Sequence, residues 1–332
     1  MRNIISVWLL LVAVFALPAA SAVPTNYDAF YVFGDSLSDT GSDFILTTSL
    51  RMDPPIPPSE SPHRTYYKGR FSNGPVAVEY LWRQLKNGAT LTPFLSNIKL
   101  DSLGGISFAF GGSTSGYLNQ VPGGFYVPGT LGQVELFRKA LKRKKAPTAL
   151  YAIWTGGNDY LLAGTNEPDA VVANIIKAIQ TLYSLGARDF LIPNLPDLGL
   201  TPLIQVKGPE AQAQFLQLTR DHNALLGQAL HRLAPRLPRI KIYVVDLFTL
   251  SQTLVNENTV ITMPPALEYL APGTGATDCF IRNPKSCPDV DLTAELPPFA
   301  FWDAMHPTTF VHELYGQAMF ERLQTGDPEL PQ

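Results

Sequence analysis

Short apolar runs recur along the chain, and each has the length of a strand that is buried on both faces. Longer segments with apolar residues at helical spacing separate these runs. The alternation predicts a parallel sheet and, because the crossovers are right-handed, helices on both of its faces. We expect one three-layer α/β/α sandwich with a doubly wound, mainly five-stranded parallel sheet. The expected strands are residues 29–33, 106–110, 149–154, 189–192 and 240–245, and the expected helices are residues 75–85, 131–141, 169–185, 210–233 and 310–323.

Glycine-rich polar turns follow the first three expected strands. They comprise residues 34–36, 111–113 and 156–159. In an open parallel sheet, ligands bind beyond the carboxyl ends of the strands. The sequence therefore predicts that the three turns converge on one functional site at this edge of the sheet.

The N-terminus is typical of a secretory signal. Arg2 provides the positive start, residues 4–17 are almost all apolar, and residues 20–22 (ASA) offer the small side chains that a cleavage site requires. The apolar run of about 14 residues is shorter than the ~20 residues that span a bilayer, and no later stretch is long enough. We expect a signal peptide over residues 1–22, a single domain over residues 23–332, and a secreted, extracellular protein without a membrane span.

The two cysteines fit an oxidising compartment, where Cys279 and Cys287 would form a disulfide. The loop between them is short, so the expected stabilisation is about 2–3 kcal/mol. Two free thiols or a metal site are the alternatives, but no histidine or third cysteine lies nearby in the sequence. We expect no metal.

The charge of the chain gives no indication of a nucleic-acid partner, because the net charge is only −3 over 332 residues. One basic cluster, residues 142–145, follows an apolar helical pattern. We interpret this cluster as the solvated C-terminal end of a helix, where cations are favourable.

Ser36 is the first candidate for chemistry, because it follows the first apolar run at an expected strand-to-helix turn. A serine in that place is often only a helix N-cap. A serine hydroxyl becomes a nucleophile when a neighbouring base removes its proton. Ser36 by itself is therefore weak evidence for catalysis.

His306 is the best-placed base among the five histidines. Asp303 precedes it by three residues, close enough to accept a hydrogen bond from one ring nitrogen while the other faces a serine. The remaining histidines lie in a proline-rich stretch or within helical patterns: His63, His222, His231 and His312.

An enzyme that transfers acyl groups also needs hydrogen-bond donors for the developing oxyanion. Gly112 and Asn158 follow two different strands, and they would supply a backbone N–H and a side-chain amide beside the Ser36 N–H. Gly-Gly and Asn-Asp pairs are also ordinary turn residues. The joint placement of these residues, and not any one of them, favours a catalytic site.

The sequence segments around these candidate residues, taken together, resemble those of the GDSL family of esterases and lipases, also called SGNH hydrolases. Residues 33–41 (FGDSLSDTG) resemble the nucleophile block, and residues 108–115 (FAFGGSTS) the glycine block, with Gly112 the better match and Gly111 the alternative. Residues 155–159 (TGGND) resemble the asparagine block, and residues 301–308 (FWDAMHPT) the Asp-x-x-His block. Residues 67–75 and 193–199 are similar to the larger, secreted members.

The resemblance implies the flavodoxin-like SGNH hydrolase fold and an acyl-enzyme mechanism without a cofactor. Ser36 would be the nucleophile, His306 the base and then the acid, and Asp303 the residue that orients it. The Ser36 amide, Gly112 and Asn158 would form the oxyanion hole. The chain has no Gly-x-Ser-x-Gly motif, which argues against the common α/β-hydrolase family. It also has no His-x-x-x-His motif or comparable spacing of metal ligands.

The expected substrate is a small-molecule carboxylic ester. Lipid esters, phospholipids included, and acetylated carbohydrates both remain open, because the family that the chain resembles acts on each. Acyl transfer to an alcohol is an alternative on the same site, and a non-catalytic binding protein is an alternative of another class. We expect a monomer. Residues 52–67 and 117–126 would border the pocket, although the first stretch also fits a plain connecting loop.

Overall fold

The structure is a computed structural model that describes residues 27–96, 104–141 and 149–325. Its centre is a six-stranded sheet in the order β2-β3-β1-β6-β7-β8, in which all neighbouring strands are parallel. The strands are β1 (Phe30–Gly34), β2 (Leu91–Pro93), β3 (Gly105–Ser107), β6 (Leu150–Trp154), β7 (Asp189–Pro193) and β8 (Lys241–Val245).

The strand order reverses beside β1. β3 and β2 lie on one side of β1, and β6, β7 and β8 lie on the other. The connections leave such a switch point in opposite directions, and they open a crevice beyond the carboxyl ends of the two central strands. Ser36 lies in the turn after β1, and Asn158 lies in α4 (Gly157–Leu161), the short helix that follows β6, so the topology places both residues at this crevice.

All five expected strands are present, but the sheet has one strand more than the mainly five-stranded prediction. The additional strand, β2, lies at the edge, has three residues and ends in Pro93. Proline cannot donate to a ladder and is tolerated at an edge. A run this short shows no apolar periodicity, and the sequence pattern therefore missed it.

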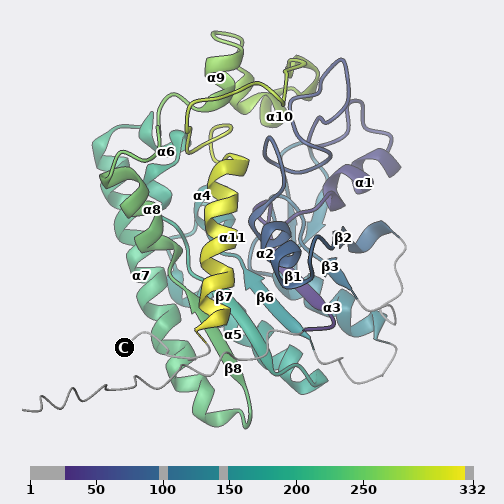
Figure 1. The fold of residues 1–332 in the computed structure, drawn as a ribbon, viewed down its shortest axis with the longest axis vertical. Coiled ribbons are helices and arrows are strands. Elements are labelled where there is room, and N and C mark those ends of the chain that lie inside the picture. The colour runs from purple at the N-terminus through teal and green to yellow at the C-terminus, as the bar shows by residue number, and fades with distance from the viewer. Residues whose placement is uncertain (1–26, 97–103, 142–148, 326–332) are drawn as a thin grey trace, which may run out of the picture.

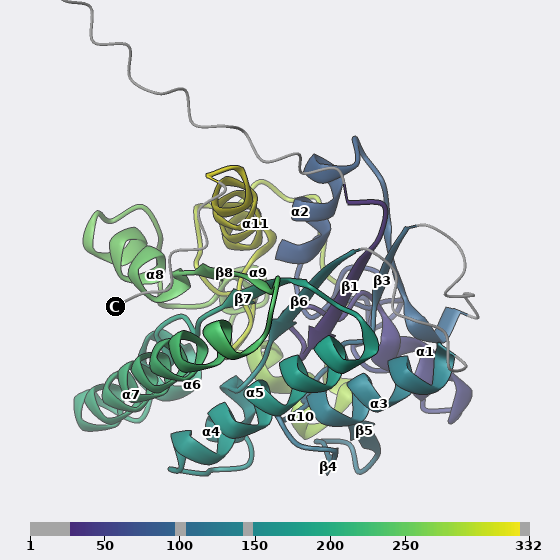
Figure 2. The same cartoon turned by 90° about the horizontal axis from the view of Figure 1, so that it is seen from below.

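Helices cover both faces of the sheet (Figure 2). Side chains alternate along a strand, so Tyr31 and Phe33 of β1 point to one face while Phe30 and Val32 point to the other. The first pair belongs to a core with α3, α5 and α7, and the second to a core with α2, α8 and α11. The three-layer prediction is confirmed. These helices are α3 (Thr130–Ala140), α5 (Pro168–Leu185), α7 (Pro209–Leu233), α2 (Ala77–Leu85), α8 (Leu247–Asn256) and α11 (Thr309–Gln324).

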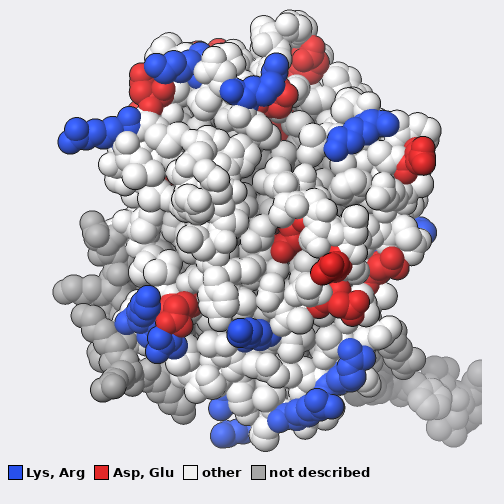
Figure 3. Space-filling model, turned by 180° about the vertical axis from the view of Figure 1, so that it is seen from behind, with Lys and Arg blue, Asp and Glu red and all other residues white. Residues whose placement is uncertain are grey.

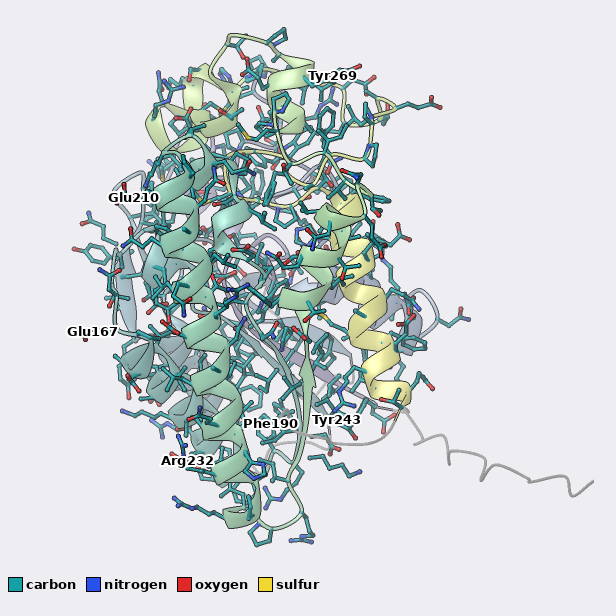
Figure 4. All side chains as sticks on the ribbon, turned by 90° about the vertical axis from the view of Figure 1, so that its left-hand side faces the viewer. Glu167, Phe190, Glu210, Arg232, Tyr243 and Tyr269 are labelled. Atoms are coloured by element: carbon teal, nitrogen blue, oxygen red, sulfur yellow. A yellow bond between two sulfur atoms is a disulfide. The ribbon has the colours of Figure 1, made fainter. Side chains whose placement is uncertain are left out.

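The 25-residue helix α7 carries charges that suit its dipole. Glu210 lies in its first turn and Arg232 in its last, and Figure 4 shows the two near opposite ends of the helix. A negative charge at the N-terminus and a positive charge at the C-terminus are both stabilising.

Loops and short elements cover the carboxyl edge of the sheet, at the top of Figure 1. Their apolar side chains form a separate buried cluster that includes Tyr66, Phe71, Phe280 and Trp302. The proline-rich residues 52–63 lie in this region without helix or strand, as expected. The short elements of the chain are α1 (Ser42–Ser49), β4 (Leu118–Gln120), β5 (Tyr126–Pro128), α4 (Gly157–Leu161), α6 (Pro202–Gln205), α9 (Ala266–Leu270) and α10 (Cys279–Arg282), with 3-10 turns at Phe94–Ser96, Leu198–Leu200, Ala234–Arg236, Ala276–Asp278 and Pro284–Ser286.

The structure contains the expected disulfide, which joins Cys279 at the start of α10 to Cys287. The expected signal peptide and the basic cluster at residues 142–145 lie outside the described residues. Within the described ranges, the helices are too short or too polar for any of them to cross a membrane. On the face drawn in Figure 3, acidic and basic side chains of the described residues are dispersed among uncharged ones.

Candidate active site

Ser36, His306 and Asp303 form a continuous chain of hydrogen bonds, although 270 positions separate the serine from the histidine. The Oγ atom of Ser36 lies 2.9 Å from Nε2 of His306, and Nδ1 of His306 lies 2.7 Å from Oδ2 of Asp303. All three residues are buried. Of the five histidines, His306 alone contacts Ser36 in the described part of the chain.

The end of β1 holds Ser36 in this position. Gln133 of α3 accepts a hydrogen bond from the Gly34 N–H and donates one to the Gly34 carbonyl, both at 2.8 Å. A Cβ atom at Gly34 would lie 2.3 Å from the Trp154 carbonyl oxygen, so the close approach of β1 to β6 requires glycine here. Helix α1 begins only after Gly41, which is its N-cap. Ser36 is therefore not a helix cap.

Four donors surround the carboxylate of Asp303. Its Oδ1 accepts the N–H groups of Met305 and His306 at 2.9 and 2.7 Å. Its Oδ2 accepts both Nδ1 of His306 and the hydroxyl of Tyr66, each at 2.7 Å. An ionised carboxylate only accepts, so Nδ1 carries the proton and Nε2 faces Ser36 as an acceptor, a tautomer that we assign from these partners.

Tyr66 was not among the residues that the sequence indicated. It lies just after the proline-rich residues 52–63, and its only signal was that residues 52–67 were expected to border the pocket. Burial and the charge of Asp303 raise the pKa of the Tyr66 phenol well above its usual value, so the hydroxyl remains a donor. The rings of Phe71 and Phe280 pack 5.1 and 5.8 Å from the imidazole of His306 and restrict its orientation.

The N–H groups of Ser36 and Gly112 make no hydrogen bond within the described ranges. The neighbouring Gly111 N–H instead donates to Oδ2 of Asp39 at 3.2 Å. Asn158 uses one hydrogen of its amide on the Ser113 carbonyl, at 3.0 Å, which leaves its second hydrogen available. Of the two glycines, Gly112 is therefore the one with a donor to offer.

Two buried aspartates fix the glycine-rich turns relative to one another. Asp39 accepts the N–H groups of Gly41, Ser42 and Asp43 as well as that of Gly111, and so ties the nucleophile turn to the glycine turn. Burial raises the pKa of Asp39 to about 6, against the opposing effect of these donors.

The asparagine turn is fixed to the glycine turn by a similar link. Asp159 accepts hydrogen bonds from the backbone and hydroxyl of Ser115, at 2.9 and 2.8 Å. Neither Asp39 nor Asp159 was predicted as a site residue, because an aspartate in a turn has no distinctive sequence signal.

Two cavities meet at Ser36. The larger, which we call the proximal cavity, comprises about 640 Å³ of space including its opening to solvent, and the smaller, the side cavity, comprises about 370 Å³ on the same basis. Ser36, Asn158, Met305 and His306 line both, whereas Gly112 lines only the side cavity. A molecule with two parts joined at a reactive carbon fits this arrangement, with one part on each side of the serine.

Asp35 lines the proximal cavity, directly before the serine. Burial raises the pKa of its carboxyl to about 7, against the hydrogen bond that it accepts from the Leu37 N–H at 3.0 Å.

The other histidines have different surroundings. His63 contacts the Cys287 carbonyl, His222 the Tyr160 hydroxyl and His312 the Ala77 N–H, while His231 is exposed on α7. Among the described residues, no group of three or more histidine, cysteine, aspartate or glutamate side chains is placed to hold a metal ion.

The fold and this hydrogen-bonded set define the class of the protein, an α/β enzyme with the side chains of a serine hydrolase. The model of the GDSL-like Lipase/Acylhydrolase family matches residues 30–319, and the chain belongs to this family. The protein is an enzyme that hydrolyses ester bonds. The alternative of a non-catalytic binding protein is therefore not supported.

Several known proteins are similar to the chain over most of its length. A phosphatidylcholine-sterol acyltransferase of Aeromonas hydrophila is 29% identical over 330 residues, which cover 89% of each chain. GDSL esterase/lipase 5 of Arabidopsis thaliana is 24% identical over 85% of this chain and 80% of its own. Among solved structures, a carbohydrate acetylesterase of Sinorhizobium meliloti, Est24, has a TM-score of 0.45 and 11% identity, with 88% of this chain and 96% of that chain covered.

Proposed function

We propose that the protein is a secreted carboxylic-ester hydrolase that acts through an acyl-enzyme on Ser36. The observation that carries the proposal is the Ser36–His306–Asp303 hydrogen-bond chain, at 2.9 and 2.7 Å, in a cavity that Gly112 and Asn158 also line. This combination of nucleophile, base and oxyanion donors is what acyl transfer requires.

The reaction would proceed in two steps. Nε2 of His306 takes the proton of Ser36 as Oγ attacks the ester carbonyl, and the oxyanion is held by the N–H groups of Ser36 and Gly112 and by the Asn158 amide. His306 then donates the proton to the leaving alcohol, and the carbon–oxygen bond breaks. A water molecule, activated by His306 in turn, attacks the acyl-enzyme and releases the acid.

Asp303 would stabilise the imidazolium that forms on His306, while it remains ionised itself. Its four hydrogen bonds support this role, because they hold the carboxylate in place beside the imidazole. Tyr66 acts only through Asp303 and would be a positioning residue.

Turnover of p-nitrophenyl acetate by the purified protein tests the proposal. We expect full activity in the presence of EDTA and the loss of nearly all activity in Ser36→Ala, whose circular dichroism spectrum should match that of the wild type. Wild-type turnover by Ser36→Ala would exclude the serine mechanism.

Export is part of the proposal and is supported by the N-terminal pattern of residues 1–22 together with the disulfide. Removal of residues 1–22 would leave Val23 as the first residue of the exported chain, followed by a single hydrolase domain over residues 23–332. N-terminal sequencing of the exported protein would reveal a different start if this boundary is wrong.

Acyl transfer to an alcohol is a second candidate function on the same site. The similarity to a phosphatidylcholine-sterol acyltransferase favours it. In this reaction an alcohol replaces water in the second step, and the product is a new ester. Analysis of the products formed with and without an added alcohol acceptor separates the two activities.

A further inference from the structure

A third cavity, which we call the distal cavity, adjoins the proximal cavity and comprises about 300 Å³ of space including its opening to solvent. The two share lining residues from the 3-10 turn Leu198–Leu200, from α8, and from α11 and the loop before it, and they are therefore adjacent. The shared residues are Leu200, Ser251, Phe301, Pro307 and Tyr315. Ser36 lines the proximal cavity, so the two adjacent cavities together extend from the nucleophile to the far wall of the distal cavity.

The lining of the distal cavity is mainly apolar, and Ser251, Thr262 and Tyr315 are its hydroxyl-bearing residues. Leu254, Val255, Val260 and Val311 form its outer wall. The hydroxyl of Ser251, where the two cavities join, is already engaged, since it donates to the Phe248 carbonyl at 2.8 Å and accepts the Asp197 N–H at 3.1 Å. The distal cavity thus offers few hydrogen-bond partners to a polar ligand, and burying an unpaired hydroxyl there would be unfavourable.

The far wall approaches the surface beside exposed apolar residues. Ile261 and Met263, which flank Thr262 of this wall, are 38% and 39% exposed. Sugars need several hydrogen-bond partners, whereas a hydrocarbon chain gains free energy from each methylene that leaves water. The mainly apolar lining of the distal cavity therefore favours a hydrocarbon chain over a sugar at this end.

We infer that the proximal and distal cavities form one channel for an unbranched hydrocarbon chain of the ester substrate, which makes long-chain esters the preferred substrates over acetylated sugars. This inference rests on the proposed function, because the ester carbonyl must lie at Ser36. The acyl chain and the alkyl chain of the alcohol share this chemistry, and the experiment below separates them.

The test uses two series of esters, p-nitrophenyl esters with acyl chains from acetate to palmitate and alkyl acetates over the same range of lengths. In the wild type, kcat/KM should rise roughly 4-fold for each methylene that enters the channel. The series that shows the rise identifies the chain that occupies the channel. A wild type with no rise in either series would overturn the inference.

Val255→Phe should fill the distal cavity, since Val255 lines that cavity and neither of the others. We expect the activity on acetate to stay within about 2-fold of the wild type and the activity on the longest ester to fall by more than about 10-fold. Val260→Phe enters the same wall from a different segment and should act likewise. Val206→Phe is the matched control, because Val206 is 72% exposed and lines none of the three cavities.

The outcomes separate this inference from the proposed function. Wild-type length profiles in both Val255→Phe and Val260→Phe, with the variants folded, would overturn the channel and leave the ester hydrolase intact. Wild-type p-nitrophenyl acetate turnover in Ser36→Ala would instead overturn the proposed function.

Discussion

Asp303 shows how single residues determine the chemistry of this site. Its Oδ2 atom accepts from both His306 and Tyr66, and its Oδ1 atom from two backbone N–H groups. These bonds fix the histidine tautomer, and only that tautomer presents an acceptor to Ser36. The sequence indicates Asp303 and His306 because they are close in the chain, but Tyr66 lies 237 positions from Asp303 and carries no local signal.

Asn158→Ala tests the oxyanion donors. The substitution removes an amide that would contact the developing negative charge, so kcat should fall by roughly 10²–10³ while KM changes little. Steady-state kinetics on p-nitrophenyl acetate measure both constants.

Asn174→Ala is the control for this variant, since Asn174 donates to Ser115 and lines neither cavity at Ser36. An unchanged kcat in Asn158→Ala would contradict a role in the oxyanion hole and leave Asn158 with only the hydrogen bond to the Ser113 carbonyl.

At the scale of elements, the long helices and the buried strands follow from apolar periodicity, and the short elements do not. β1 is a continuous apolar run and was expected within one residue of its observed bounds. By contrast β4 and β5 have three residues each, too few for a period to emerge. The turn after β1 was expected from its glycine. The two hydrogen bonds between Gln133 and Gly34 that hold this turn were not expected, because they depend on α3 packing against the strand end.

The contribution of the disulfide to stability can be tested directly. The bond between Cys279 and Cys287 closes a short loop next to Phe280, a residue of the buried cluster above the sheet. Replacement of both cysteines by serine should lower the free energy of unfolding by about 2–3 kcal/mol, because the unfolded chain gains entropy. Urea denaturation measures this loss, and kcat on p-nitrophenyl acetate should stay within about 2-fold because neither cysteine lines a cavity at Ser36.

The wild type treated with a reductant serves as the control and should behave as the double variant does. Alkylation of both cysteines in the native, unreduced protein would show that the bond does not form.

At the scale of the whole molecule, the switch in strand order beside β1 brings the predicted site residues together. The sequence predicts this convergence, because every polar turn follows a strand. The cavities were not predictable in the same way. Loops and helices from distant regions of the chain enclose them. The loops have no periodicity from which packing can be derived. Substrate preference belongs to this unpredicted part.

The pH dependence of unfolding also belongs to the whole molecule. His312 of α11 accepts the Ala77 N–H at the start of α2, at 3.3 Å, and burial lowers its pKa to about 3. The unfolded chain takes up this proton near pH 6.5, so the stabilisation is present above that pH and is lost as the pH falls toward 3. His312→Gln removes this pH-dependent contribution to the free energy of unfolding. The difference in unfolding free energy between wild type and variant should therefore shrink by about 2 kcal/mol from pH 7 to pH 5.

Urea denaturation of the two proteins at each pH measures the difference, with the exposed His231→Gln as a control that should leave it constant. The buried Asp35 and Asp39, whose pKa values are raised to about 7 and about 6, oppose the trend because the folded state holds their protons more tightly. They are present in all three proteins and cancel in the comparison. A constant difference between wild type and His312→Gln would contradict a neutral, buried His312.

The central claim, that Ser36 attacks the ester carbonyl, is tested most directly by locating the adduct of a p-nitrophenyl alkylphosphonate. The phosphonate resembles the tetrahedral intermediate and stays bound to the nucleophile. Peptide mass spectrometry of the inactivated enzyme should place the phosphonyl group on Ser36, in proportion to the activity lost. Complete inactivation with the group on any other residue would contradict the account.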